Sequence, residues 1–313
     1  MNHKSILLKI FISFGLLMIF LLNTDLLGMF YALSHISVKM LLIVLVLYFF
    51  SIYINSFKWF LILPQNKVID LFKLNLLGAY YSLVLPGQLA GDLVKAYKLG
   101  KGQKDAEQVV ASVFVDKVTG FIGLFIVGTV GIFFTSIDVP SSLGWILLCG
   151  VVIGVLVLLS IRIKGVYNLI LKVFLMIPKK IVRLKKIIEQ IIPLLEAWKV
   201  YSQKLNLIIL SILIGIVFQV ISVIIIYILA NQIGVYLSFF ELCWIHCFVS
   251  LVVLLPFTIG GLGLREGTFI GILSWQGIAS KEALALSLSI FAIQIIGALV
   301  GAFFDFTMKI EKK

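Results

Sequence analysis

Two pairs of oppositely charged residues lie in otherwise apolar sequence: Asp92 with Lys95, and Arg265 with Glu266. A charge at the centre of a bilayer costs about 2.5–3.5 kcal/mol on insertion scales, so such residues usually face a partner, a watery cavity or an interface. The guanidinium of arginine is a planar donor fork that matches phosphate. Carboxylates can balance these cations or bind an amino group. The residue types therefore indicate a site for a charged headgroup that contains phosphate.

Each pair follows a proline and several glycines, and the two stretches resemble copies of one sequence motif. Both stretches have a Leu-Pro step at the end of an apolar run, with a glycine five residues after the proline and a cation nine residues after it. The prolines and glycines of the two stretches are Pro86, Gly87 and Gly91, and Pro256, Gly260, Gly261 and Gly263. Proline and glycine at membrane depth indicate broken helices, and paired interruptions in two halves of a chain are a pointer to a transport site.

A third charged pair, Asp116 and Lys117, opens the next apolar span. We interpret this pair either as the lining of an inner vestibule, with ligand contacts, or as an interface pair that anchors its helix. Alternatives also stay open for the other pairs. Arg265 and Glu266 can be a buried pair that only locks two helices. Lys95 can be a cation whose long side chain reaches the membrane surface.

The composition places the chain in a membrane. Its mean hydropathy is +1.18, and 62% of residues are hydrophobic while 13% are charged; soluble domains carry about a quarter charged residues. The net charge of +12 comes from cations in the linkers between apolar segments. Because no basic stripe is interleaved with exposed aromatics, we expect no nucleic-acid partner. Anionic membrane phospholipid is the natural partner of this charge.

The elements that must position the charged pairs are apolar segments of about 20 residues, each long enough to cross roughly 30 Å of hydrocarbon. The sequence predicts spans at 5–23, 37–57, 116–135, 143–161, 206–230, 238–257 and 283–306. The interrupted segments 72–96 and 258–279 are interpreted as re-entrant or broken helices, the second with a short helix from Arg265 to Trp275. The fold class is thus an all-α polytopic membrane protein with about eight transmembrane helices and two broken Pro-Gly segments in a pseudo-repeat.

The basic residues predict the orientation of the chain. Most of the 26 lysines and arginines fall on one side of the membrane if the N-terminus is inside, so both termini are expected on the cytoplasmic side of the inner membrane. Residues 162–205 alternate basic and apolar positions, which is typical of a helix lying on an anionic leaflet or of a basic loop. This linker divides one integral-membrane domain, 1–313, into halves at 1–161 and 206–313.

The sequence lacks the marks of a catalytic or metal centre. It contains no Gly-rich phosphate loop, HExxH or GxSxG motif, so we expect neither an enzyme nor a cofactor. Cys149, Cys243 and Cys247 fall in apolar spans without zinc-ligand spacing, and we interpret them as packing residues. Gln219, in mid-span, is expected to hydrogen-bond between helices.

Three motifs resemble those of a known family, and they read Pro86-x4-Gly91-Asp92-x2-Lys95, Ser112-x3-Asp116-Lys117 and Pro256-x3-Gly260-Gly261-x-Gly263-x-Arg265-Glu266. They are similar to motifs of the integral-membrane, flippase-like domain of lysylphosphatidylglycerol synthases of the multiple peptide resistance factor type, over about residues 6–308. Aspartates stand at 92 and 116 where the family usually has glutamate, and lysines at 95 and 117 where it usually has arginine.

The resemblance implies lipid handling rather than lipid synthesis, because the soluble synthase domain does not occur in these 313 residues. It favours a flippase or transporter that moves a phospholipid or a lipid-linked headgroup between leaflets, with Arg265 and Lys95 on phosphate and the acids as their balance. The alternative is a membrane-embedded accessory subunit or transferase in lipid-linked glycan or aminoacyl-lipid metabolism. That alternative implies a lipid-modifying enzyme or glycosyltransferase as partner. A small-solute permease is a third possibility, and the oligomeric state is not indicated.

Overall fold

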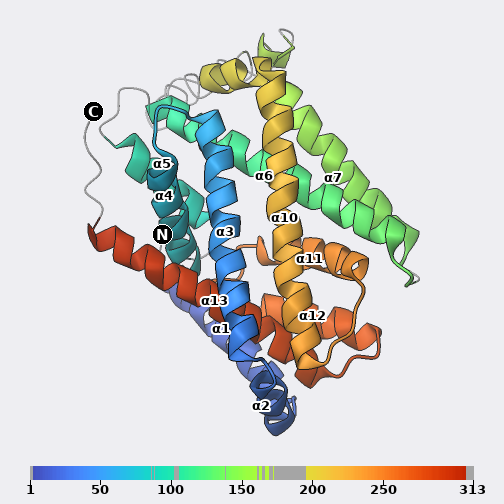
Figure 1. Ribbon diagram of the computed structural model, residues 1–313. Helices are drawn as coiled ribbons and strands as arrows, with labels where there is room; N and C mark the ends of the chain where they lie inside the picture. Colours follow the sequence, from blue (N-terminus) through green and yellow to red (C-terminus); the bar gives the residue numbers. More distant parts are fainter. Residues whose placement is uncertain are drawn as a thin grey trace.

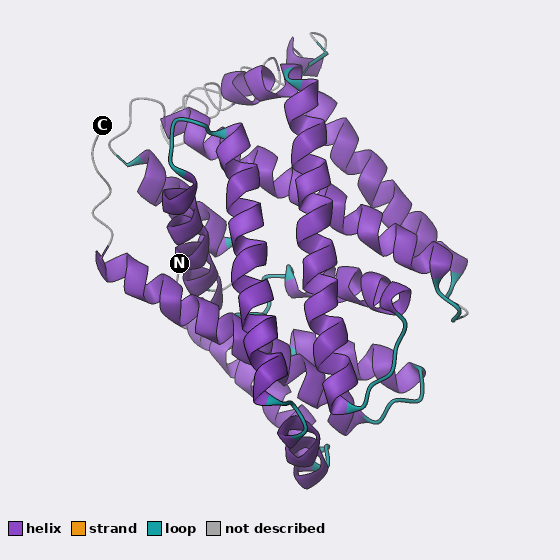
Figure 2. Ribbon diagram, viewed as in Figure 1, coloured by secondary structure: helices purple, strands orange, loops and turns teal. Residues whose placement is uncertain are grey.

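Every regular element of the described chain is helical. The computed structural model describes residues 3–85, 87, 89–101, 106–137, 139–160, 162–163, 166–168, 172 and 195–307, and this part contains no strand (Figure 2). The helices are α1 (His3–Leu22), α2 (Leu26–Ser34), α3 (Val38–Ile62), α4 (Val68–Val84), α5 (Ala90–Gly100), α6 (Ala106–Phe134), α7 (Ser141–Ser160), α10 (Leu205–Ile233), α11 (Phe239–Val253), α12 (Leu264–Trp275) and α13 (Ser280–Thr307). The prediction of an all-α membrane protein is confirmed.

Five of these helices are long and apolar enough to cross a membrane: α3, α6, α7, α10 and α13. A sixth span is possible if α1 and α2, which meet at a bend of 92°, count as one. Helices α11 and α12 have 15 and 12 residues, and twelve residues rise only about 18 Å, which is less than a bilayer core. The described residues therefore confirm a multi-pass protein but not the predicted count of eight crossings.

The two halves pack into each other in a reciprocal way. The long helices α3 and α10 run antiparallel along one another (Figure 1), and α4 of the first half packs on α13 while α11 of the second half packs on α6. Glycines make both of these helix contacts possible. An added Cβ at Gly301 would overlap the carbonyl oxygen of Leu76, and one at Gly131 would lie 2.7 Å from the carbonyl oxygen of Phe240. Small residues at such crossings let the backbones approach closely. The predicted pseudo-repeat of the two halves stays a prediction.

Both predicted interruptions are present as breaks between short helices. The first break separates α4 from α5, and the second break separates α11 from α12. Positive φ angles are found at Gly87 in the first break (93°) and at Gly260, Gly261 and Gly263 in the second (61°, 75° and 84°), a region of backbone space that favours glycine. Pro86, predicted to end the first helix, lies outside the described residues.

The two breaks lie against each other. A Cβ added at Gly87 would be 3.4 Å from the Cβ of Pro256, and one added at Gly260 would be 3.2 Å from Leu83. Gly91 leaves no room for a side chain, because an added Cβ would overlap the carbonyl oxygen of Gly78. Gly91 thus allows α5 to pack back onto α4, and the breaks are fixed in place by close backbone contact.

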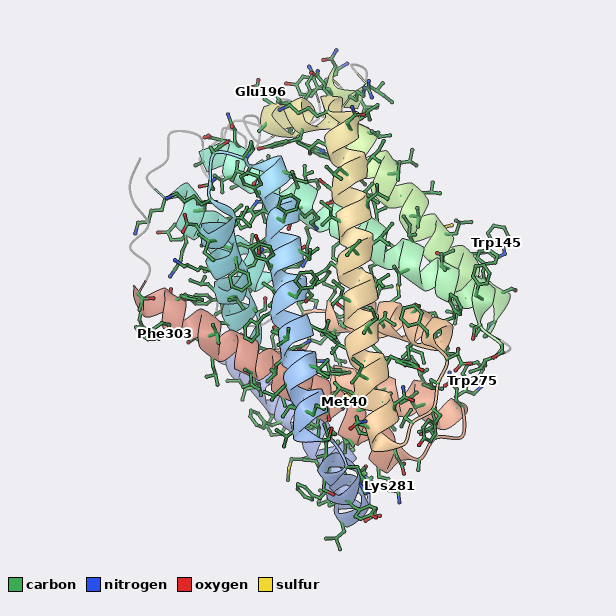
Figure 3. The ribbon with its side chains drawn as sticks, viewed as in Figure 1. Met40, Trp145, Glu196, Trp275, Lys281 and Phe303 are labelled. Carbon is green, nitrogen blue, oxygen red and sulfur yellow. The ribbon has the colours of Figure 1, made fainter. Side chains whose placement is uncertain are left out.

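The ends of the molecule fit the predicted topology. Met40 and Lys281, both on the predicted outer side, lie toward one end of the molecule, whereas Glu196 lies at the other (Figure 3). Residues 195–203 are helical and directly precede α10. Most of the predicted surface helix at 162–205 lies outside the described residues, and the orientation of the protein in its membrane stays a prediction.

Candidate functional site

A cavity of about 410 Å³ lies where the two breaks meet. Its walls come from both halves of the chain, on α3, α4, α5, α6, α10, α11, α12 and α13. Five of the six charged residues that the sequence singled out line it, namely Asp92, Lys95, Asp116, Lys117 and Arg265. The fold therefore brings the charged residues of both breaks to one hollow inside the protein.

A chain of alternating charges runs along the first-half side of this cavity. Lys58 Nζ lies 3.1 Å from Asp116 Oδ1, and Lys95 Nζ lies 3.8 Å from Asp116 Oδ2 and 2.9 Å from Asp92 Oδ1. The second oxygen of Asp92 is 2.8 Å from Lys117 Nζ. Three cations and two carboxylates thus form one network, which we call the lysine–aspartate chain, and its formal charge is positive.

Lys95 is held at the centre of the lysine–aspartate chain. Only 4% of it is exposed, so it is not the interfacial cation of the alternative reading. Besides its two acids, it donates to Asn75 Oδ1 at 3.1 Å and lies 4.9 Å from the ring centre of Trp59. A buried ammonium needs this number of partners, because its desolvation is costly.

Lys58 is a member of the site that the sequence analysis missed. The predicted span ended at residue 57, which placed Lys58 among the cytoplasmic cations, but α3 continues to Ile62 and leaves Lys58 only 2% exposed. Its ammonium also donates to the backbone carbonyl of Asp116 at 2.8 Å. The spacing of Ser51, Asn55 and Lys58 is a signal that could have found it, since positions i, i+4 and i+7 share a helix face and all three line the cavity.

Arg265 faces the cavity from the second break with part of its guanidinium unused. The residue is 3% exposed, and its Nη2 donates to the carbonyl of Gly260 at 3.2 Å. Its Nη1 is buried and has no hydrogen-bond partner among the described residues. The guanidinium lies 5.2 Å from the ring centre of Phe291. A buried donor without a partner is costly in a folded protein, and it marks a position where a ligand would be stabilised.

Glu266 has a different environment from the one expected for a ligand-binding acid. It is fully buried and does not line the cavity. One carboxylate oxygen accepts from the backbone N–H of Gly263 at 2.6 Å, and the other accepts from Ser287 Oγ at 3.0 Å. Glu266 therefore caps the start of α12 and fastens it to α13, which makes it a positioning residue for Arg265.

A neutral polar chain enters the cavity from the opposite wall. His246 Nε2 lies 3.0 Å from Gln219 Oε1, and Gln219 Nε2 lies 3.4 Å from the carbonyl oxygen of Gly120. Gln219 thus joins α10, α11 and α6 through hydrogen bonds, as its mid-span position predicted. Cys243 and Cys247 on α11 are buried and free, and no cluster suited to a metal ion occurs among the described residues.

These features define a polytopic helical membrane protein with a charged cavity between two broken helices. The family model described as the lysylphosphatidylglycerol synthase TM region matches residues 6–301. The chain belongs to this family, as the motifs predicted, and this membership supports a lipid-related role in the membrane. No curated protein and no solved structure matches the chain.

Proposed function

We propose that this protein moves lipids with anionic, phosphate-containing headgroups between the leaflets of the membrane, and that the headgroup passes through the cavity between the breaks. Family membership supports the class of substrate, because it links the chain to lipid handling. The cavity supports the route, because it lies inside a protein whose other surfaces are largely apolar. The phosphate is the part of a lipid that cannot cross hydrocarbon unaided.

The charges of the cavity favour an anion over a cation. Its lining contains four basic side chains against two carboxylates; these are Lys58, Lys95, Lys117 and Arg265 against Asp92 and Asp116. In a site shielded from water the attraction between such an excess and an anion is stronger than at a surface. Two oxygens of a phosphate can also accept from the parallel N–H groups of an arginine fork.

The unpartnered Nη1 of Arg265 is the observation that carries this proposal. A residue that served only to lock helices would have its polar atoms satisfied, as the ammonium of Lys95 and the carboxylate of Glu266 have. Lys117 is the second proposed contact, since its side chain is 33% exposed and shares Asp92 with Lys95. An incoming phosphate can replace Asp92 as the partner of Lys117 without leaving any charge of the network unpaired.

The direct test is lipid movement in proteoliposomes that contain a fluorescent phosphatidylglycerol. Arg265→Ala is expected to reduce the rate of movement at least tenfold, which corresponds to a barrier raised by about 1.4 kcal/mol or more. Lys281→Ala is the matched control, because this half-exposed cation pairs only weakly with Asp25 and Glu282, away from the cavity. Movement at the wild-type rate in both Arg265→Ala and Lys117→Ala would exclude the proposed site.

A further inference from the structure

His246 is the titratable group of the cavity that the proposed headgroup site does not use. It lies on α11, lines the cavity and is hydrogen-bonded to one neutral amide oxygen. Among the described residues it has no carboxylate within ion-pair distance, in contrast to every lysine of the lysine–aspartate chain. An imidazolium at this position would therefore have no counter-ion of its own.

The hydrogen bonds around His246 fix which nitrogen is basic. The carbonyl of Gly120 can only accept, so the Gln219 group that meets it is the NH₂, and the amide oxygen of Gln219 faces His246. His246 must then donate its Nε2–H to that oxygen. In the neutral ring the other nitrogen, Nδ1, is consequently the one that can take up a proton.

The charges around His246 decide when that proton is favourable. Helix α10 presents no charged or titratable side chain to the cavity, and its polar lining residues are the neutral Gln219 and Ser222. The charged or titratable side chains that face the cavity from the other elements are Asp116, Lys117, Arg265, Lys58, Tyr48, Asp92 and Lys95. On and beside its own helix are Glu241, in the capping box of α11, the thiols Cys243 and Cys247, and Glu266, which is held by Gly263 and Ser287. In the empty cavity the excess of cations opposes a further positive charge.

We propose that His246 binds a proton at Nδ1 when an anionic headgroup occupies the cavity, so that proton and anion are taken up together. The inference rests on the proposed anion site, because the phosphate provides the counter-charge that the protein itself does not. By linkage, a proton that favours the anion is favoured by the anion to the same extent. The protein would then be able to use a proton gradient to drive the movement of its lipid.

Calorimetry of the purified full-length protein with dioctanoyl phosphatidylglycerol, in two buffers of different ionisation enthalpy, tests this coupling by counting protons. Wild-type protein is expected to take up protons, up to one per bound lipid, and to bind up to about tenfold more tightly for each unit by which the pH is lowered. In His246→Gln, which keeps a donor for Gln219 but does not titrate, lipid still binds and the proton uptake disappears. His35→Gln, which changes an exposed histidine far from the cavity lining, retains the uptake.

The outcomes separate this inference from the function on which it rests. If wild-type protein binds no lipid, the anion site and the proton site both fail. If it binds lipid without proton uptake, only the proton site fails. Uptake that persists in His246→Gln identifies Asp92 or Asp116 as the proton acceptor and overturns the assignment. Should His246→Gln not fold, nitrogen-15 spectra of labelled wild-type histidines decide the matter, because the half-buried imidazole of His246 must become doubly protonated when lipid is added.

Discussion

The first and second breaks share a sequence pattern but use their acids in opposite ways. In the first break, Asp92 forms ion pairs with Lys95 and Lys117 and so belongs to the charged lining of the cavity. In the second break, Glu266 turns away from the cavity and binds the start of its own helix, which leaves Arg265 with a free donor. The cations of the first break are thus paired with acids of the protein, whereas the second break leaves a donor for an external anion.

The spacing of the residues explains this difference. Asp92 and Lys95 are three residues apart in α5 and therefore lie on one helix face. Arg265 and Glu266 are adjacent, so their side chains point about 100° apart around α12. Gly263 is the N-cap of α12, so Glu266 is the third helical residue, where an acid reaches back to the backbone N–H of the N-cap. The order and spacing of acid and base therefore decide whether the acid forms a salt bridge, as Asp92 does, or a helix cap, as Glu266 does.

Removing the shared acid of the lysine–aspartate chain should have the largest effect. Asp116→Asn leaves Lys58 and Lys95 buried with an incomplete set of partners, and loss of one member of a buried ion pair costs about 3–5 kcal/mol. Thermal unfolding in detergent measures it. Glu282→Gln, at the weak surface contact with Lys281, is the control and should cost less than about 1 kcal/mol. A stability loss equal to that of the control would mean that the chain contributes little to folding.

Alanine substitutions at glycines of the two short helices, α5 and α12, should differ almost as much in their effect on stability. Gly91→Ala introduces a methyl group that overlaps the backbone of Gly78, and overpacking of this kind costs about 1–3 kcal/mol or more. Gly271→Ala on α12 is the matched change, since nothing lies within 4 Å of its added Cβ, and it should be neutral or stabilising by up to about 1 kcal/mol. Equal melting temperatures for the two variants would contradict the proposed close contact of α4 and α5.

Glu266→Gln separates a helix cap from a ligand-binding acid. The amide retains an acceptor but loses the charge that strengthens the bond to the Gly263 N–H, so stability should fall by about 1–2 kcal/mol. Ser287→Ala removes the second partner of Glu266 and should have an effect of similar size. The contrary result is a variant with wild-type stability and weakened lipid binding, which would place Glu266 among the ligand contacts.

The smallest effect is expected for the polar contacts that hold α4 and α5 against α13 outside the cavity. Lys98 on α5 forms an ion pair with Asp305 on α13, and Asp305 Oδ2 accepts from the hydroxyl of Tyr81 at 2.8 Å. Tyr81→Phe removes one hydrogen bond and should cost about 0.5–1.5 kcal/mol. Lipid movement should be unchanged, since these side chains do not line the cavity. A transport defect in this stable variant would show that the position of α5 controls the cavity.

Much of the fold could be predicted because it follows from local properties of the chain. Apolar length defined the spans, and the structure matches them at α3, α7, α10 and α13 within a few residues. Proline and glycine marked both breaks. The prediction failed where a helix continues into polar sequence. Helix α6 begins at Ala106 rather than at the predicted residue 116, because helix propensity does not stop where hydropathy falls.

The candidate site was predicted less completely. The residue types and their positions beside helix breaks identified Arg265, Lys95, Asp92, Asp116 and Lys117, all of which line the cavity. Lys58 was missed because a cation at the end of an apolar run usually faces the membrane surface, and only the partner on α6 shows otherwise. Glu266 was given a ligand role because its type and its neighbour were read without the geometry of the helix start.

The sequence by itself determined that this chain is a helical membrane protein with two breaks and charged residues beside them, because hydrophobic length, helix breaking and charge cost act along a single segment. Only the tertiary structure decided that the breaks meet, that Lys58 enters the charged chain, and that Arg265 keeps a donor free beside the cavity. These outcomes depend on contacts between residues far apart in the chain. Such contacts are set by how helices pack, and no local pattern encodes them.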